Sequence, residues 1–187
     1  MRILGVDPGS EITGYGVIDA SADGAQLRVI DFGEIRGDVA RRPLPERLAH
    51  LHAGLARVIH ATRPASVVVE GLFYAKNARA ALTIGHARGV ALLAAAERGI
   101  PVVEYAPPEV KRAICGNGAA RKLQVQYMVQ RLLSLAEAPP VDAADALAIA
   151  ICHARRLHGI ELEARQVPTT RLDGRRFGTA RVVESRS

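Results

Sequence analysis

The order of the apolar segments is the feature that most constrains the fold of this 187-residue chain. Three segments with strand-like composition come first, at residues 1–7, 12–19 and 26–35, and short stretches of turn-forming residues separate them. Strands joined by such short connections pair in antiparallel fashion. We therefore predict a three-stranded antiparallel meander at the start of the chain.

Beyond residue 40, helical and strand-like patterns alternate. Leucines at helical spacing predict a helix that starts near Pro43 and ends at Arg63, and further helices are expected at residues 77–99, 108–115, 120–135 and 141–158. Two buried strands are expected at residues 67–70 and 101–105. This order predicts one α/β domain over residues 1–158, with a mixed sheet covered by helices on both faces. Residues 159–187 are polar and lack periodicity, so we predict a flexible, basic tail.

Composition and charge narrow the classes of function. The chain is 49% hydrophobic, which argues against a mainly disordered protein, and its apolar runs are too short to span a bilayer. The cysteines Cys115 and Cys152 are isolated from each other, as expected in a reducing cytosol, and we predict a cytoplasmic location. The formal charge of +6, with basic residues concentrated between residues 105 and 131, points to a polyanionic partner.

Four carboxylates stand at unusual positions. Asp7 and Glu70 each end an apolar strand, and Asp142 and Asp145 lie on one face at the start of an alanine-rich helix. Singly, they could be a turn residue, a surface charge and a helix cap. If the first and fourth strands are parallel neighbours, however, all four carboxylates can meet. Four ionised carboxylates need cations, and Mg²⁺ is the natural one, so the pattern predicts a site for phosphodiester hydrolysis.

Several short blocks resemble the RuvC family of Holliday junction resolvases, and they occur in the family's order over about residues 1 to 158. The blocks are Gly5-Val-Asp-Pro-Gly-Ser10, Thr13-Gly-Tyr-Gly-Val17, Val69-Glu-Gly-Leu-Phe-Tyr-Ala-Lys-Asn77, Gly85-His-Ala-Arg-Gly89, Lys111 with Gly116-Asn-Gly118 and Lys122, and Asp142-Ala-Ala-Asp-Ala-Leu-Ala148. The resemblance implies an RNase H-like fold with a five-stranded mixed sheet in the order 3-2-1-4-5. It also implies a homodimer that makes paired symmetric nicks in four-way junction DNA, during recombination and repair.

The same resemblance assigns roles by position. It implies that Asp7, Glu70, Asp142 and Asp145 are the catalytic and metal-binding residues, with two Mg²⁺ per active site and Mn²⁺ as a substitute. Some family members carry His at one of the last two positions, whereas this sequence has Asp at both. The branch-migration proteins RuvA and RuvB are implied as partners.

Six residues are candidates for DNA contact. Phe73 and Tyr74 follow Glu70 closely, and exposed aromatic side chains there would either wedge between bases or fold back as a small core. The resemblance implies that Phe73 is the residue that wedges between bases. The other four candidates are basic: Lys76, Arg79, Lys111 and Lys122. Lys111 and Lys122 flank a glycine loop that can approach a phosphate, whereas the alternative for all four is an ordinary solvated position.

The helix at residues 77–98 carries a stripe of Leu82, Gly85, Gly89 and Leu93. Small residues four apart allow close helix packing, either against the protein's own sheet or, as the resemblance implies, against a second subunit.

Three other functions fit part of the pattern. An actin-like ATP-binding domain also begins with a strand, Asp, Gly and Ser, but it needs about twice this length and a second phosphate loop. Another RNase H-like nuclease, for instance one acting on RNA–DNA hybrids, shares the carboxylates but not the Phe73 segment. A non-catalytic DNA-binding module does not require the carboxylate set.

Overall fold

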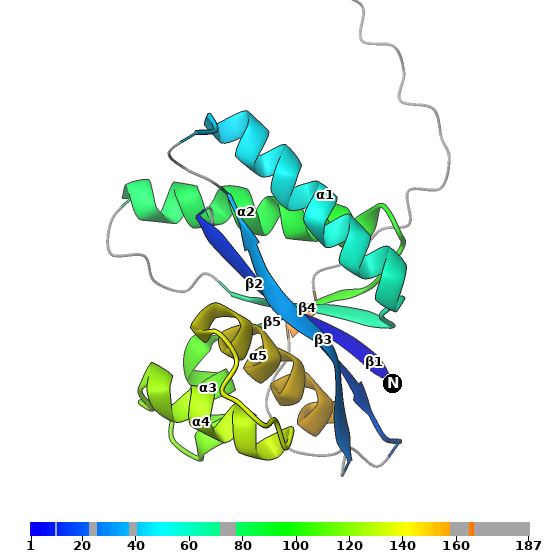
Figure 1. Cartoon of the computed structure of the whole chain (residues 1–187), viewed down its shortest axis with the longest axis vertical. Coiled ribbons are helices and arrows are strands. Elements are labelled where there is room, and N and C mark those ends of the chain that lie inside the picture. The colour runs from blue at the N-terminus through cyan, green and yellow to red at the C-terminus, as the bar shows by residue number, and fades with distance from the viewer. Residues whose placement is uncertain (10, 23–25, 38–40, 72–77, 158–164, 167–187) are drawn as a thin grey trace, which may run out of the picture.

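The protein is an α/β domain with one central sheet, seen in a computed structural model (Figure 1). The structure describes residues 1–9, 11–22, 26–37, 41–71, 78–157 and 165–166. In chain order the elements are β1 (Arg2–Asp7), β2 (Ile12–Ala20), β3 (Leu27–Arg36), α1 (Leu44–Thr62), β4 (Ser66–Glu70), α2 (Ala78–Ala96), β5 (Val102–Tyr105), α3 (Pro107–Cys115), α4 (Lys122–Leu132), α5 (Val141–Leu157) and β6 (Arg165–Gln166).

The sheet confirms the predicted strand order. The strands β1, β2 and β3 form the antiparallel meander, and β4 and β5 add to it in parallel with β1, which gives the order β3-β2-β1-β4-β5. The two-residue strand β6 extends this sheet by pairing antiparallel with the edge of β5. It comes from the segment for which we predict a flexible tail, most of which lies outside the described residues.

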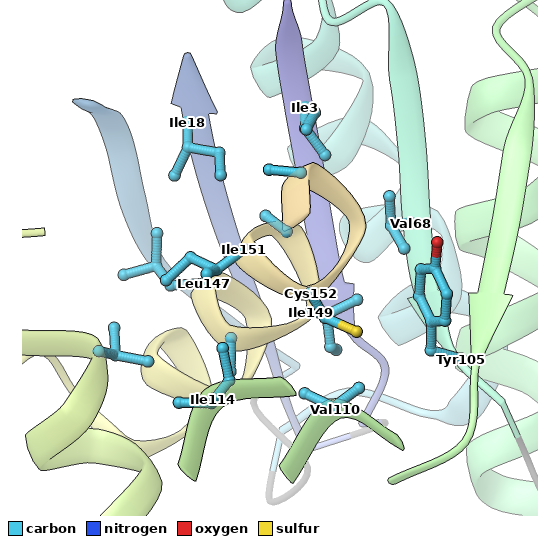
Figure 2. Packing of buried hydrophobic residues seen from close by; sticks show 14 of the residues in the cluster. Ile3, Ile18, Val68, Tyr105, Val110, Ile114, Leu147, Ile149, Ile151 and Cys152 are labelled. Atoms are coloured by element: carbon cyan, nitrogen blue, oxygen red, sulfur yellow. The ribbon is translucent and has the colours of Figure 1, made fainter. Parts of the chain in front are cut away.

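Helices cover both faces of the sheet, as predicted. Because successive side chains on a strand point to opposite faces, Ile3 and Leu4 belong to two different core clusters. One cluster lies between the sheet and α1 and α2, and the other lies between the sheet and the layer of α3, α4 and α5. Figure 2 shows the second cluster, in which Ile149 of α5 packs near Val68 and Tyr105.

The helix ends follow local backbone chemistry. Helix α1 stops because Arg63 adopts a left-handed conformation with φ 48° directly before Pro64. Helix α4 is shorter than predicted at both ends. Arg121 is extended with ψ 155° and forms the N-cap, and Ser134 has φ 51°, which no α-helix accepts. Asn77, the predicted cap of α2, lies outside the described residues. Among the residues described, no helix has both the length and the apolar character needed to cross a membrane.

Candidate active site

Two of the predicted carboxylates leave the sheet at one edge. Asp7 is the last residue of β1 and Glu70 is the last residue of β4. The two strands are parallel neighbours, with Val6 opposite Val69 in the register. Because parallel strands end at the same edge, Asp7 and Glu70 lie side by side at the sheet's C-terminal edge, as the sequence argument required.

Helix α5 brings the other two carboxylates to this edge because strand glycines let it approach very closely. A Cβ atom on Gly14 would lie 1.9 Å from the carbonyl oxygen of Asp142, and one on Gly5 would lie 2.0 Å from that of Ala146. Both distances are far below contact, so only glycine fits at either position. The backbone of α5 therefore rests directly on β1 and β2, and its first turns place Asp142 and Asp145 beside Asp7.

The four carboxylates form two overlapping groups of three, one of tightly spaced oxygens and one that lines a small pocket. Asp7, Asp142 and Asp145 each offer an oxygen, and these three oxygens lie within 4.8 Å of one another. Glu70 is outside that tight group, but it lines a pocket of about 250 Å³ together with Asp7 and Asp145. The donors are all carboxylate oxygens, which is the ligand set of a hard divalent cation such as Mg²⁺. The residues therefore fit a metal site.

The electrostatics show how strongly the carboxylates crowd. Burial, followed by the charges of Glu70 and Asp145, raises the pKa of Asp7 to about 8. Burial and then the charge of Asp145 also raise the pKa of Glu70, against the nearby Lys122 and Lys111. Both shifts have the sign expected where desolvation and like charges disfavour ionisation, and a bound cation would oppose both causes.

Two lysines complete the pocket. The Nζ atom of Lys122 lies 3.0 Å from Oδ2 of Asp145, and Lys111 lines the same pocket from α3. Desolvation works to lower the pKa of Lys122, but its hydrogen bond to Asp145 and the surrounding carboxylates raise it overall, so this side chain carries a full positive charge. The structure thus places Lys111 and Lys122, which the sequence offered only as candidates for DNA contact, beside the carboxylates.

The other DNA-contact candidates are not placed. Phe73, Tyr74 and Lys76 lie outside the described residues. Arg79 belongs to α2, but its side chain also falls outside the described part of the structure.

Sequence reasoning missed the residues that dock α5. Gly5, Gly14 and Gly16 belong to the blocks that resemble the RuvC family, and at each of these positions an added Cβ would collide with α5. The available signal was the presence of glycine inside strands, where it weakens the strand unless another backbone approaches closely.

The fold and the site define an RNase H-like α/β protein with a carboxylate centre able to hold metal ions. A family model described as "Crossover junction endodeoxyribonuclease RuvC" matches residues 3–153. The chain is 53% identical over 155 residues to the protein of that name from Chloroflexus aggregans, covering 82% of this chain and 93% of that protein. It is 51% identical over 154 residues to the protein of that name from Halorhodospira halophila, covering 82% and 89%. The chain belongs to the family of RuvC crossover junction endodeoxyribonucleases.

Solved structures agree with this assignment. Thermus thermophilus RuvC in complex with a Holliday junction substrate superposes with a TM-score of 0.78 at 38% identity, covering 84% of this chain and 95% of that one. The yeast mitochondrial Holliday junction resolvase Ydc2 has a TM-score of 0.58 at 14% identity, covering 83% and 79%, and this likeness shows the shared fold.

Proposed function

We propose that this protein resolves Holliday junctions by placing two symmetric nicks in four-way junction DNA. The observation that carries the proposal is a cluster of carboxylates. Asp142 lies close to Asp7 and Asp145, and these last two line one pocket together with Glu70 and two lysines. Family membership supports junction DNA as the substrate, because the similar Thermus thermophilus protein binds a Holliday junction. Neither an ATP-binding domain nor a non-catalytic DNA-binding module calls for this set of side chains.

The carboxylates act as the ligands of the site. Asp7, Glu70, Asp142 and Asp145 would hold two Mg²⁺ ions, with Mn²⁺ able to replace Mg²⁺. When bound, such ions supply an activated water and stabilise the leaving oxygen in phosphodiester hydrolysis. Burial and like-charge crowding raise the pKa of Asp7 and Glu70, and a bound cation would relieve the repulsion between these carboxylates.

The lysines provide positive charge for the substrate. Lys111 on α3 and Lys122 on α4 both line the pocket. The ammonium groups of these lysines attract the oxygens of a scissile phosphate that enters the pocket and the charge that develops during hydrolysis.

Paired nicks require two active sites, and α2 offers a surface for a homodimer. Leu82 and Leu93 are 64% and 52% exposed. A Cβ atom on Gly85 or Gly89 would meet no described atom within 4 Å, so the stripe does not pack against the protein's own sheet. An outward stripe of leucines and glycines fits the α2 helix of a second subunit, as two-fold symmetric cleavage demands.

A gel assay tests the proposal. The protein with Mg²⁺ should nick a synthetic four-way junction at symmetric positions, while linear duplex and an RNA–DNA hybrid of the same sequence stay largely intact. Ca²⁺ should support binding with little cleavage, because its looser coordination positions water poorly. Preferred cleavage of the hybrid would assign the protein to another RNase H-like activity.

Phe73 is proposed to open the junction near the exchange point, and Tyr74, Lys76 and Arg79 to support the opened strands. Unstacking one base step costs a few kcal/mol, and stacking on an aromatic ring recovers about 1–3 kcal/mol. Phe73→Ala should therefore lose most cleavage of an intact junction, and a junction with unpaired bases at its centre should restore part of it. Cleavage of the intact junction by this variant at the wild-type rate would show that Phe73 does not act as a wedge.

The cellular setting follows from the substrate. Junction DNA in bacteria such as the source organisms of the relatives forms in the cytoplasm, so we place the protein there. Its proposed partners are the branch-migration proteins RuvA and RuvB, and a pull-down of either from a junction complex tests that assignment.

A further inference from the structure

Helix α4 presents an apolar and aromatic stripe to solvent. Leu123 is 72% exposed and Tyr127 is 59% exposed, and the four-residue spacing places them on one side of the helix. Arg131 continues the stripe one turn later and is also exposed. The opposite side of α4 is buried through Val125 and Val129, so burial in the core does not explain the stripe.

The charge around this stripe has one sign. No acidic residue occurs in the sequence between Arg121 and Arg131, and Arg121, Lys122 and Arg131 are all exposed. A single exposed leucine needs no explanation. An exposed leucine and tyrosine bordered by cations, however, match a polyanion that also offers apolar surface, and duplex DNA with its phosphates and sugars is such a partner.

The stripe starts at the rim of the active site. Lys122, the first residue of α4, contacts Asp145, and Leu123 is its neighbour in the chain. Figure 1 shows α4 on the outer side of α5, away from the sheet, so nothing in the described sheet covers this face. At 1.5 Å per helical residue, Tyr127 lies about 7 Å and Arg131 about 14 Å along the axis from Lys122.

We propose that the face of α4 formed by Leu123, Tyr127 and Arg131 holds one duplex arm of the junction. This inference rests on the proposed function and adds a second contact region to it. In this arrangement Leu123 packs on sugars, the Tyr127 hydroxyl donates a hydrogen bond to a phosphate, and Arg131 binds a further phosphate. These contacts carry no base sequence, so they fix where the arm lies and leave the chemistry at the carboxylates unchanged.

The position of the contacts can be mapped with neutral phosphates. At 3.4 Å per base pair, the stripe covers about two to four base pairs from the scissile phosphate. Junctions would carry methylphosphonates either about two to five nucleotides from the scissile phosphate or about ten to thirteen nucleotides away. Binding of the wild type, Tyr127→Phe and Arg131→Ala would be measured on both and on the unmodified junction. Arg57→Ala on α1 serves as the charge control, because Arg57 is exposed and lies on the helix layer across the sheet.

On the unmodified junction, Tyr127→Phe and Arg131→Ala should each bind about three- to tenfold more weakly than the wild type, while Arg57→Ala binds normally. The near methylphosphonates should weaken junction binding by the wild type to a similar extent. They should weaken binding by either variant little further, because the side chain and the phosphate take part in the same interaction. The distant methylphosphonates should affect the wild type and these variants equally. Cleavage rates at saturating protein should stay at the wild-type value.

Two further substitutions probe the apolar part. Leu123→Ala should weaken binding about threefold, whereas Leu157→Ala, which changes a 51% exposed leucine at the end of α5, should not. The inference is wrong if the α4 variants bind every junction like the wild type, or if their losses simply add to that from the near methylphosphonates. Such a result, with normal wild-type cleavage, would leave the proposed function standing and make a protein the occupant of the stripe. Absence of junction cleavage by the wild type would instead overturn the proposed function itself.

Discussion

The two ends of α5 hold ionisable groups in opposite kinds of surroundings. At the N-terminal end, Asp142 and Asp145 join Asp7 in a cluster of like charges. At the C-terminal end, Nδ1 of His153 lies 2.8 Å from the hydroxyl of Tyr105, and the guanidinium of Arg156 sits 4.9 Å from the centre of the Tyr105 ring. The N-terminal end brings like charges together, whereas at the C-terminal end Tyr105 and His153 form a hydrogen bond with each other.

This difference separates function from structure along a single helix. Burial raises the pKa of Tyr105 to about 12, and burial lowers the pKa of His153 to about 4, so both groups are neutral and are joined by a hydrogen bond. A neutral, hydrogen-bonded pair stabilises the fold and needs no further ligand. At the carboxylate end, burial and neighbouring negative charges raise the pKa of Asp7 to about 8. Bound cations would offset the repulsion between these carboxylates. A perturbed pKa therefore indicates a structural role where the group has a hydrogen-bond partner in the protein. It indicates a functional site where the group is surrounded by like charges.

The largest expected effect comes from removing a ligand at the crowded end. Asp7→Asn and Asp145→Asn should each lower cleavage about a thousandfold or more, since loss of a metal ligand removes several kcal/mol of transition-state stabilisation. Junction binding should remain near the wild-type value because basic residues carry it. A His153→Asn variant at the other end of α5 should keep most of its cleavage. Full activity in either Asp variant would take that residue out of the site.

The second effect concerns how α5 is held against the sheet. Gly14→Ala should lose cleavage almost completely and unfold several degrees lower, because a Cβ atom there collides with the carbonyl oxygen of Asp142 and must push the start of α5 away. Gly33→Ala in β3 is the matched control. Its Cβ would approach the Tyr15 side chain at 3.0 Å, and a side chain moves more easily than a helix backbone, so the control should retain cleavage. Equal activity in both variants would show that the fit of α5 does not position the carboxylates.

Much of this arrangement follows from local sequence signals. The site carboxylates can be recognised from the local sequence. Apolar strands end in Asp7 and Glu70, and a helix starts with Asp142 and Asp145. The strand order could be predicted from the antiparallel meander, from the alternation of helices and strands that follows it, and from the family resemblance. The docking of α5 could not, because it depends on contacts between Gly14 and Asp142, which are 128 positions apart. The end of α4 was also missed, since nothing in the residue type of Ser134 demands its left-handed conformation.

The third prediction uses pH to test the neutral end of α5. His153 has a pKa of about 4 when folded and about 6.5 when unfolded, so below pH 6.5 the unfolded chain binds a proton that the folded chain does not. The stability from this buried ring is complete above pH 6.5 and is lost as pH falls toward 4, by up to about 3 kcal/mol. Urea unfolding of the wild type and of His153→Asn, which cannot titrate, isolates this contribution. The difference between the two proteins should shrink steadily from pH 7 to pH 4.5. A constant difference would mean that folding leaves the pKa of His153 unchanged.

The smallest expected effect reports the crowding at the N-terminal end of α5 directly. The pKa of Asp7 is raised to about 8, so the folded protein retains a proton that the unfolded chain releases above about pH 4, and stability without metal falls as pH rises toward 8. The charge of Asp142 contributes to that shift. Asp142→Asn should therefore raise the melting temperature of the metal-free protein, by the equivalent of about 0.5–2 kcal/mol, and more at pH 9 than at pH 6 because Asp7 is then ionised.

The matched control is an aspartate in a paired setting. Asp19 lies 2.9 Å from Nε of Arg2 and 3.2 Å from a guanidinium nitrogen of Arg28, and its hydrogen bond with Arg2 lowers its pKa. Asp19→Asn should thus lower the melting temperature, so the same chemical change has opposite signs at the two sites. Mg²⁺ should stabilise the wild type and Asp19→Asn equally but Asp142→Asn less, because only the last variant has lost a ligand that the folded state offers to the ion. If Asp142→Asn melts lower than the wild type without metal and gains as much from Mg²⁺, the carboxylates do not repel one another and the contrast between the ends of α5 fails.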